Sequence, residues 1–141
     1  ADPIGINVFS GNDKATVVTD TGIISDDILH RLDDSTLLVL EANYDPHMLR
    51  FGPYQPFLKQ RVASDEGHLS NEMAAQALLM MKRPDFMQVI LAHRSENNNN
   101  AVLVTQTIGK MLVDGGVRIG PEMKLQHGQP NEIVSMQSIK R

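Results

Sequence analysis

Residues 89–98 read Val-Ile-Leu-Ala-His-Arg-Ser-Glu-Asn-Asn, an apolar run that changes abruptly into a polar loop. A continuous apolar run of this length predicts a buried strand, over residues 86–92, with His93 at its end. Asn98 or Asn99 can cap a following helix that runs to about Asp114 and ends at Gly115. Strand ends of this kind are where α/β sheets place ligands and chemistry.

Two further strands with an ionisable residue at the end are predicted upstream of this segment. Residues 4–9 and 14–19 indicate a hairpin that delivers Asp20. Residues 35–40 predict a strand buried on both faces, and Glu41 follows it. The strands alternate with helices, so the sequence predicts an α/β fold, with a mixed sheet because the hairpin adds an antiparallel pair.

The remaining elements are predicted from helix-capping residues and from residues such as proline and glycine that interrupt regular structure. Ser25 can cap a helix through Leu32, and Ser70 can cap a helix over residues 71–82. Residues 44–62 hold three prolines, which predicts an irregular segment. The tail contains two strand-like pieces, residues 117–119 and 133–136, around a region rich in Gly, Pro and Gln.

The composition limits the classes of function. The chain has 141 residues, enough for one domain with a core, and its lack of cysteine excludes disulfides, a thiol nucleophile and Cys-ligated metals. The lack of cysteine fits a reducing, cytoplasmic setting, and no apolar run approaches the length needed to span a membrane. The net charge of −4 gives no broad footprint for nucleic acid. Arg50, Lys59 and Arg61 form the one local basic cluster, which is either a phosphate site or a solvated helix face.

Four residues carry the candidate chemistry. Asp20 is either a metal ligand or the cap of its turn. His93 suits zinc, manganese or iron, or else is a half-buried histidine bonded to a carbonyl. His68 precedes a helix whose positive end would lower its pKa, leaving a usable proton donor or acceptor near neutrality. Glu41 can orient His68 by accepting its ring N–H.

These ligands are too few for a dinuclear site. One Asp and one His leave each metal ion short of several protein ligands, and the chain contains no His-x-His pair. The residues therefore indicate part of a site.

Several short motifs resemble the C-terminal half of the metallo-β-lactamase-fold hydrolases, in particular their YycJ/WalJ-type branch of DNA exonucleases. The matching segments are residues 19–22, 40–46, 48–50, 52–54, 58–61, 67–72, 91–93 and 96–98. The resemblance implies an αββα sandwich with two divalent metal ions, zinc or manganese, between its sheets. It implies that Asp20 bridges the ions, that His93 binds one of them, and that Glu41 and His68 act as the acid–base pair of a phosphodiesterase.

The sequence also departs from that family. It lacks the His-x-His-x-Asp-His motif, and Arg94 stands where relatives often carry an apolar residue. We therefore expect residues 1–141 to form a single incomplete domain, inactive by itself, whose partner is the N-terminal half of the same protein. Nucleic acid is the expected substrate, with Arg50, Lys59, Arg61, Asn97 and Asn98 holding phosphates.

Two other hypotheses stay open from the sequence. One keeps the fold but changes the substrate to a small phosphodiester, lactone or thioester. The other is a non-catalytic half domain that binds a partner, and exposed sheet surface would then favour a homo-oligomer or a domain swap.

Overall fold

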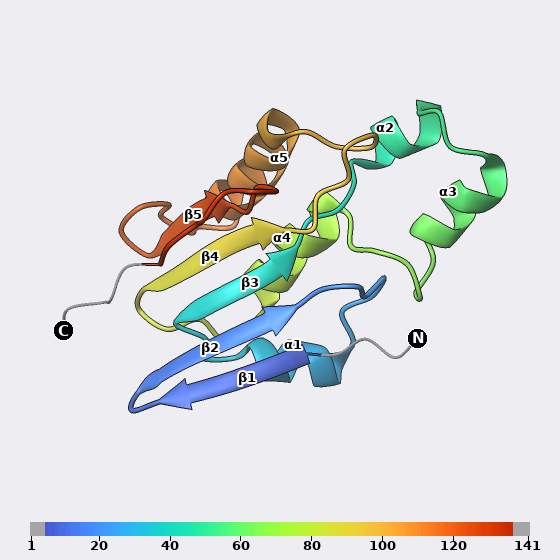
Figure 1. Ribbon diagram of the computed structural model, residues 1–141. Coiled ribbons are helices and arrows are strands. Elements are labelled where there is room, and N and C mark those ends of the chain that lie inside the picture. Colours follow the sequence, from blue (N-terminus) through green and yellow to red (C-terminus); the bar gives the residue numbers. More distant parts are fainter. Residues whose placement is uncertain (1–4, 137–141) are drawn as a thin grey trace.

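A single mixed sheet organises the described part of the chain, residues 5–136 of a computed structural model. Within those residues five strands pair in the order β1-β2-β3-β4-β5. Strands β1 (Gly5–Ser10) and β2 (Asp13–Val18) form an antiparallel hairpin (Figure 1). Strands β3 (Leu37–Glu41), β4 (Met87–Ala92) and β5 (Met123–His127) continue the sheet in parallel with β2. The predicted mixed α/β class is confirmed.

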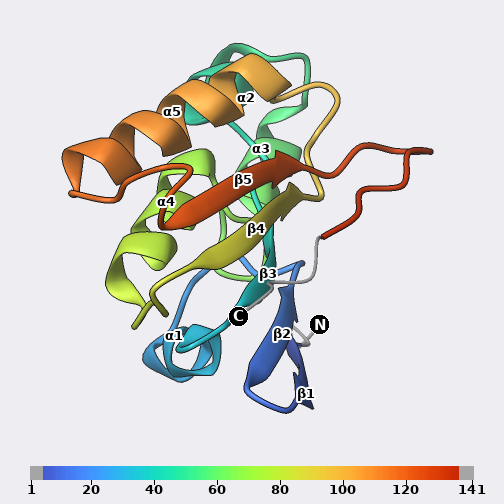
Figure 2. The ribbon, with the colours of Figure 1, turned by 90° about the vertical axis from the view of Figure 1, so that its left-hand side faces the viewer.

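The helices take two positions relative to this sheet. Helices α1 (Asp26–Leu32), α4 (Asn71–Met80) and α5 (Ala101–Asp114) lie on one side of it (Figure 2). Helices α2 (Pro46–Phe51) and α3 (Pro56–Val62) lie beyond the C-terminal ends of the parallel strands (Figure 1). Between residues 5 and 136, none of the helices combines the length and apolar character that crossing a membrane requires.

Side-chain caps explain where the main helices begin. Ser25, Ser70 and Asn100 each accept a hydrogen bond from a backbone N–H three residues ahead, at 3.3, 3.1 and 2.9 Å. Such caps satisfy donors that the first helical turn leaves without a partner. The predicted caps at Ser25 and Ser70 are confirmed, and the cap of α5 lies one residue beyond the predicted pair.

The two faces of the sheet differ in burial. Leu38, Leu40 and Val89 are fully buried under the helices. Leu37 and Val39 on the opposite face are only half-buried, so the prediction of a strand buried on both faces is wrong. Because side chains alternate along each strand, the paired register places further apolar residues on this second face. We call it the open sheet face; it comprises Ile6, Val8, Val17, Leu37, Val39 and Ile90.

Two other predictions from the sequence are wrong. Residues 44–62 are not irregular, because Pro46 and Pro56 stand in the first turns of α2 and α3, where a missing N–H costs nothing. The tail strand is β5, inside the segment taken as a turn region, whereas residues 133–136 form no strand. Met123 and Leu125 face the core with period two, a pattern hidden by the Gly- and Pro-rich flanks.

Candidate active site

Three of the predicted residues lie at one edge of the sheet because their strands are parallel neighbours. Asp20 follows β2 by two residues, Glu41 is the last residue of β3, and His93 directly follows β4. Glu41 pairs in register with Ala92, which places His93 beside it. Asp20 and His93 both adopt left-handed backbone conformations, with φ of 58° and 55°. Such conformations cost about 1–3 kcal/mol in residues other than glycine and are typical of functional positions.

His68 reaches the same edge from the loop between α3 and α4. The loop turns tightly at Gly67, where an added Cβ would lie 2.2 Å from the carbonyl oxygen of Val62. The backbone N–H of His68 donates to that same carbonyl at 2.9 Å, and the Leu69 carbonyl accepts from the N–H of Asn43 at 2.9 Å. The loop is thereby fastened both to α3 and to the segment after β3, which directs the imidazole toward Glu41.

Glu41 joins the two histidines. The Nδ1–H groups of His68 and His93 each donate to the same oxygen, Oε1, at 2.7 Å. The other oxygen, Oε2, accepts from the backbone N–H groups of Thr21 and Leu69 at 3.3 and 3.4 Å. The Glu41 side chain is 0% exposed, and these four donors offset the cost of burying its charge. The predicted contact between Glu41 and His68 is present, and the equivalent bond from His93 was not anticipated.

The electrostatics of His68 differ from the prediction. The hydrogen bond to Glu41 raises the pKa of His68 above its ordinary value, and the charges of Glu41 and Asp20 act in the same direction. Burial and the positive charge of Arg61 oppose this increase in pKa. The expected lowering by the start of α4 is therefore wrong, because a direct bond to a buried carboxylate outweighs it. His68 holds its proton to higher pH than a free imidazole, as suits a proton donor.

Asp20 completes the group that we call the strand-end cluster, consisting of Asp20, Glu41, His68 and His93. Its Oδ1 lies 3.9 Å from Nδ1 of His68 and 3.7 Å from Nδ1 of His93. One ligand atom from each member lies within 4.8 Å of all the others, and the described residues contain no second such group of His, Cys, Asp or Glu. The Asp20 side chain is 63% exposed and makes no short contact to either ring, so its oxygens are accessible to an ion.

The donor set fits a divalent metal ion. Both rings use Nδ1 to donate to Glu41, which leaves Nε2 with the lone pair that a metal needs. Imidazole nitrogen and carboxylate oxygen are ligands that zinc, manganese and iron accept. The cluster supplies too few donors for two complete coordination shells, in agreement with the ligand count made from the sequence.

The predicted phosphate-binding residues separate in the structure. Arg61 lines a hollow of about 370 Å³ together with Asp20 and His68. Lys59 instead donates to the backbone carbonyl of Arg50 at 2.8 Å, and Arg50 lies over the ring of Phe51. These three basic residues therefore do not converge on the cluster, and Arg61 alone of them lines a hollow with it.

Asn97 and Asn98 border a central hollow of about 500 Å³ together with Asp20, His68 and His93. Asn98 is buried and organises its own loop, since its backbone carbonyl accepts from Asp45 and its N–H donates to Ser95.

A pair of buried asparagines supports the cluster, although no motif in the sequence predicted it. The side-chain amides of Asn71 and Asn99 bond reciprocally, at 2.8 and 3.1 Å. Asn99 also donates to the carbonyl of Ala42, next to Glu41, at 3.1 Å. Asn43 donates to the carbonyl of His93 at 2.6 Å. Some of the polar residues in these loops therefore have a structural role, because their hydrogen bonds link three separate segments next to the cluster.

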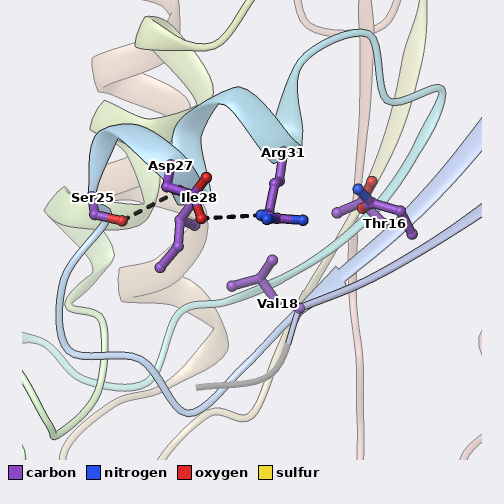
Figure 3. A pocket seen from close by; sticks show the side chains of 8 residues that line it. Thr16, Val18, Ser25, Asp27, Ile28 and Arg31 are labelled. Atoms are coloured by element: carbon purple, nitrogen blue, oxygen red, sulfur yellow. Dashed lines mark hydrogen bonds and ion pairs between the residues drawn. The ribbon is translucent and has the colours of Figure 1, made fainter. Parts of the chain in front are cut away.

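A separate hollow lies between the hairpin and α1 (Figure 3). It has a volume of about 460 Å³, and its labelled lining residues include Thr16 and Val18 from β2 and Ile28 from α1. An ion pair between Asp27 and Arg31, at 3.1 Å, lies across one wall. It contains no histidine and none of the strand-end cluster.

Fold and site together define a mixed α/β protein with a histidine–carboxylate group suited to a divalent metal ion. The sequence is 30% identical over 139 residues to the protein named exodeoxyribonuclease YycJ of Bacillus anthracis, covering 99% of this chain and 53% of that protein. It is 33% identical over 132 residues to the proteins named exodeoxyribonuclease WalJ of two Streptococcus pneumoniae strains, D39 and R6, covering 93% of this chain and 49% of each.

These matches confirm the resemblance found in the sequence, because homologues named YycJ and WalJ cover nearly all of this chain. The chain spans about half the length of these relatives. No protein-family model matches the chain. No solved structure matches it either.

Proposed function

We propose that this chain is part of a metal-dependent hydrolase that cleaves phosphodiester bonds, as a DNA exonuclease. The observation that carries the proposal is the strand-end cluster, which brings Asp20, His68 and His93 around one buried carboxylate. The similarity over nearly the whole chain to proteins named exodeoxyribonucleases supports the choice of substrate. A cytoplasmic location remains part of this proposal.

The position of each residue in the strand-end cluster suggests its role in the proposed reaction. Asp20 and His93 are the metal ligands, since Asp20 is accessible and His93 keeps Nε2 free. Glu41 holds both rings in one tautomer, so it is a positioning residue. In its doubly protonated form His68 delivers a proton from Nε2 to the leaving oxygen, and its raised pKa keeps that form populated to higher pH. When bound, divalent ions supply charge neutralisation at the phosphate and an activated water.

The proposed site is incomplete within this chain. Two zinc or manganese ions need more protein donors than the cluster provides, so we expect the isolated chain to be inactive. The open sheet face supports a missing second layer, because its apolar residues Ile6, Val8 and Val17 are 54%, 58% and 38% exposed. The N-terminal half of the same protein is the proposed occupant, which would make residues 1–141 one half of an αββα sandwich.

The open sheet face also favours a second candidate function, a non-catalytic half domain. Exposed apolar strands promote pairing with another chain, so a homo-oligomer or a domain swap would cover the same residues. Light scattering separates the two states of the isolated chain, and the partner-binding hypothesis predicts a dimer or larger species. A stable monomer at high concentration would contradict it.

The catalytic proposal is tested by hydrolysis of a labelled single-stranded oligonucleotide with zinc or manganese present. We expect the longer polypeptide that includes the proposed N-terminal half to be active and residues 1–141 alone to be inactive. The substitution His68→Gln should lower kcat by about 10²- to 10⁴-fold, while the matched control His47→Gln, at an exposed histidine on α2, should not. Cleavage of small esters or lactones without cleavage of the oligonucleotide would replace the proposed substrate.

A further inference from the structure

Three neighbouring hollows lie around the strand-end cluster. The central hollow shares Asp20 and His68 with the hollow that contains Arg61. On the other side it shares His93 and Arg94 with a third hollow of about 670 Å³, which extends to Gln129. Because neighbouring hollows share their walls, we treat the three together as one trough. The cluster lies at its middle, with Arg61 on the His68 side and Arg94 on the His93 side.

Among residues 5–136, Arg94 differs from most of the arginines in that its side chain has no protein partner. Arg31 and Arg118 form ion pairs with acidic residues one turn away, and Arg83 donates to backbone carbonyls. Between residues 5 and 136, no hydrogen bond or ion pair involves the Arg94 side chain, although it is half-buried. A guanidinium that is partly removed from water without a counter-ion is suited to an anionic ligand.

The surroundings of Arg94 fit a nucleic acid strand better than a small anion. Tyr54 lines the central hollow and offers an aromatic face on which a base can stack. Burial, together with the charge of Arg94, lowers the pKa of His127, so the end of β5 adds no positive charge near neutrality. Glu96 borders the trough too and opposes an anion there. Arg94 is therefore the main cation on this side.

We propose that the trough holds one single strand of nucleic acid, with Arg94 and Arg61 binding backbone phosphates on opposite sides of the phosphate that is cleaved. The inference rests on the proposed function and adds a substrate requirement: a phosphate on each side of the one that is cleaved, which for an exonuclease means that the strand end carries a terminal phosphate. Arg94 is then a positioning residue, since it holds the strand and does not touch the reacting atoms.

Binding of a fluorescein-labelled oligothymidylate of about ten nucleotides to the 141-residue chain, followed by anisotropy, tests this inference without catalysis. We expect Arg94→Gln to weaken binding about fivefold and to reduce the slope of log K against log salt by about 0.7, the loss of one phosphate contact on a single strand. Arg118→Gln removes the same charge at an exposed ion pair outside the trough and should change neither quantity.

Two further variants refine the result. Arg94→Lys should restore the salt slope but only part of the affinity, because an ammonium cannot form the bidentate contact. Glu96→Gln should strengthen binding, since it removes a carboxylate from the trough. Equal binding by the Arg94→Gln and Arg118→Gln variants, or no salt-dependent binding by the unmodified chain, would overturn the inference.

Kinetics of the longer polypeptide distinguish a failure of this inference from a failure of the proposed function. Arg94→Gln should raise KM for the oligonucleotide more than it changes kcat, and it should raise KM for the oligonucleotide more than KM for bis(p-nitrophenyl) phosphate. Absence of any phosphodiester hydrolysis would overturn the proposed function, whereas hydrolysis with an unchanged KM in Arg94→Gln would overturn only the role of Arg94.

Discussion

The substitution Glu41→Gln probes how one buried carboxylate supports the whole site. In the structure Oε1 accepts from two imidazole N–H groups and Oε2 from two backbone N–H groups. A glutamine amide has the same shape but only one accepting oxygen. Whichever way it is oriented, its NH₂ group must face a pair of donors.

The two orientations have different costs. If the amide oxygen faces the rings, the N–H groups of Thr21 and Leu69 lose their acceptor. Their bonds are long, at 3.3 and 3.4 Å, so we expect about 1–3 kcal/mol of lost unfolding free energy and a fall of roughly 3–10 °C in Tm. If the NH₂ group faces the rings, His68 and His93 must accept at Nδ1 and carry their protons on Nε2. The fold then changes little, but metal affinity should fall about 10- to 100-fold.

Urea unfolding and competitive zinc titration of the same samples measure both costs. The matched control Glu132→Gln removes an exposed carboxylate and should stay within about 0.5 kcal/mol of the unmodified chain. If Glu41→Gln leaves both the unfolding free energy and the zinc affinity unchanged, the shared carboxylate does not organise this site and the reasoning is refuted.

Three other perturbations have defined outcomes. The pKa of His68 is raised in the folded state, so its bond to Glu41 should stabilise the fold fully below a pH of about 6.5. This stabilisation should be lost as the pH rises through the folded-state pKa. In the metal-free chain, His68→Gln should therefore flatten that part of the pH dependence of the unfolding free energy, measured with urea. Gly67→Ala places a Cβ 2.2 Å from the Val62 carbonyl oxygen and should displace the loop that carries His68. We expect the longer polypeptide to lose activity, while hydrogen exchange should show that α4 remains folded. Asn100→Ala removes the cap of α5 and should cost about 1 kcal/mol in urea unfolding, and a cost near zero would show that the cap bond contributes nothing.

The positions of Asp20, Glu41 and His93 were predictable from the sequence because the signal is local. Each follows an apolar run of strand length, and parallel neighbouring strands bring such ends to one edge. His68 was placed near a helix start by the cap at Ser70. The residue types then indicated the chemistry. The site residues could be found without a hydrophobic pattern that repeats every two residues, as in a strand, or with helical spacing.

The interactions between these residues were not predictable in the same way. His93 and Glu41 are 52 positions apart, and the convergence of both rings on one oxygen depends on the register of β3 with β4 and on the loop at Gly67. The hydrogen bond between His68 and Glu41 also reversed the expected direction of the His68 pKa. Local pattern likewise gave no sign that Asn71 and Asn99 pair in the interior.

The central claim is that the strand-end cluster binds a divalent ion through His93 and Asp20. Long-range ¹H–¹⁵N NMR of the imidazole nitrogens during a zinc titration tests it most directly. Before zinc, Nδ1 of His68 and His93 should carry the proton; on zinc addition, Nε2 of His93 should shift first, and Asp20→Asn should weaken that response. Zinc that perturbs His30 or His47 at the surface as strongly as His93, or leaves the His93 nitrogens unchanged, would contradict the account.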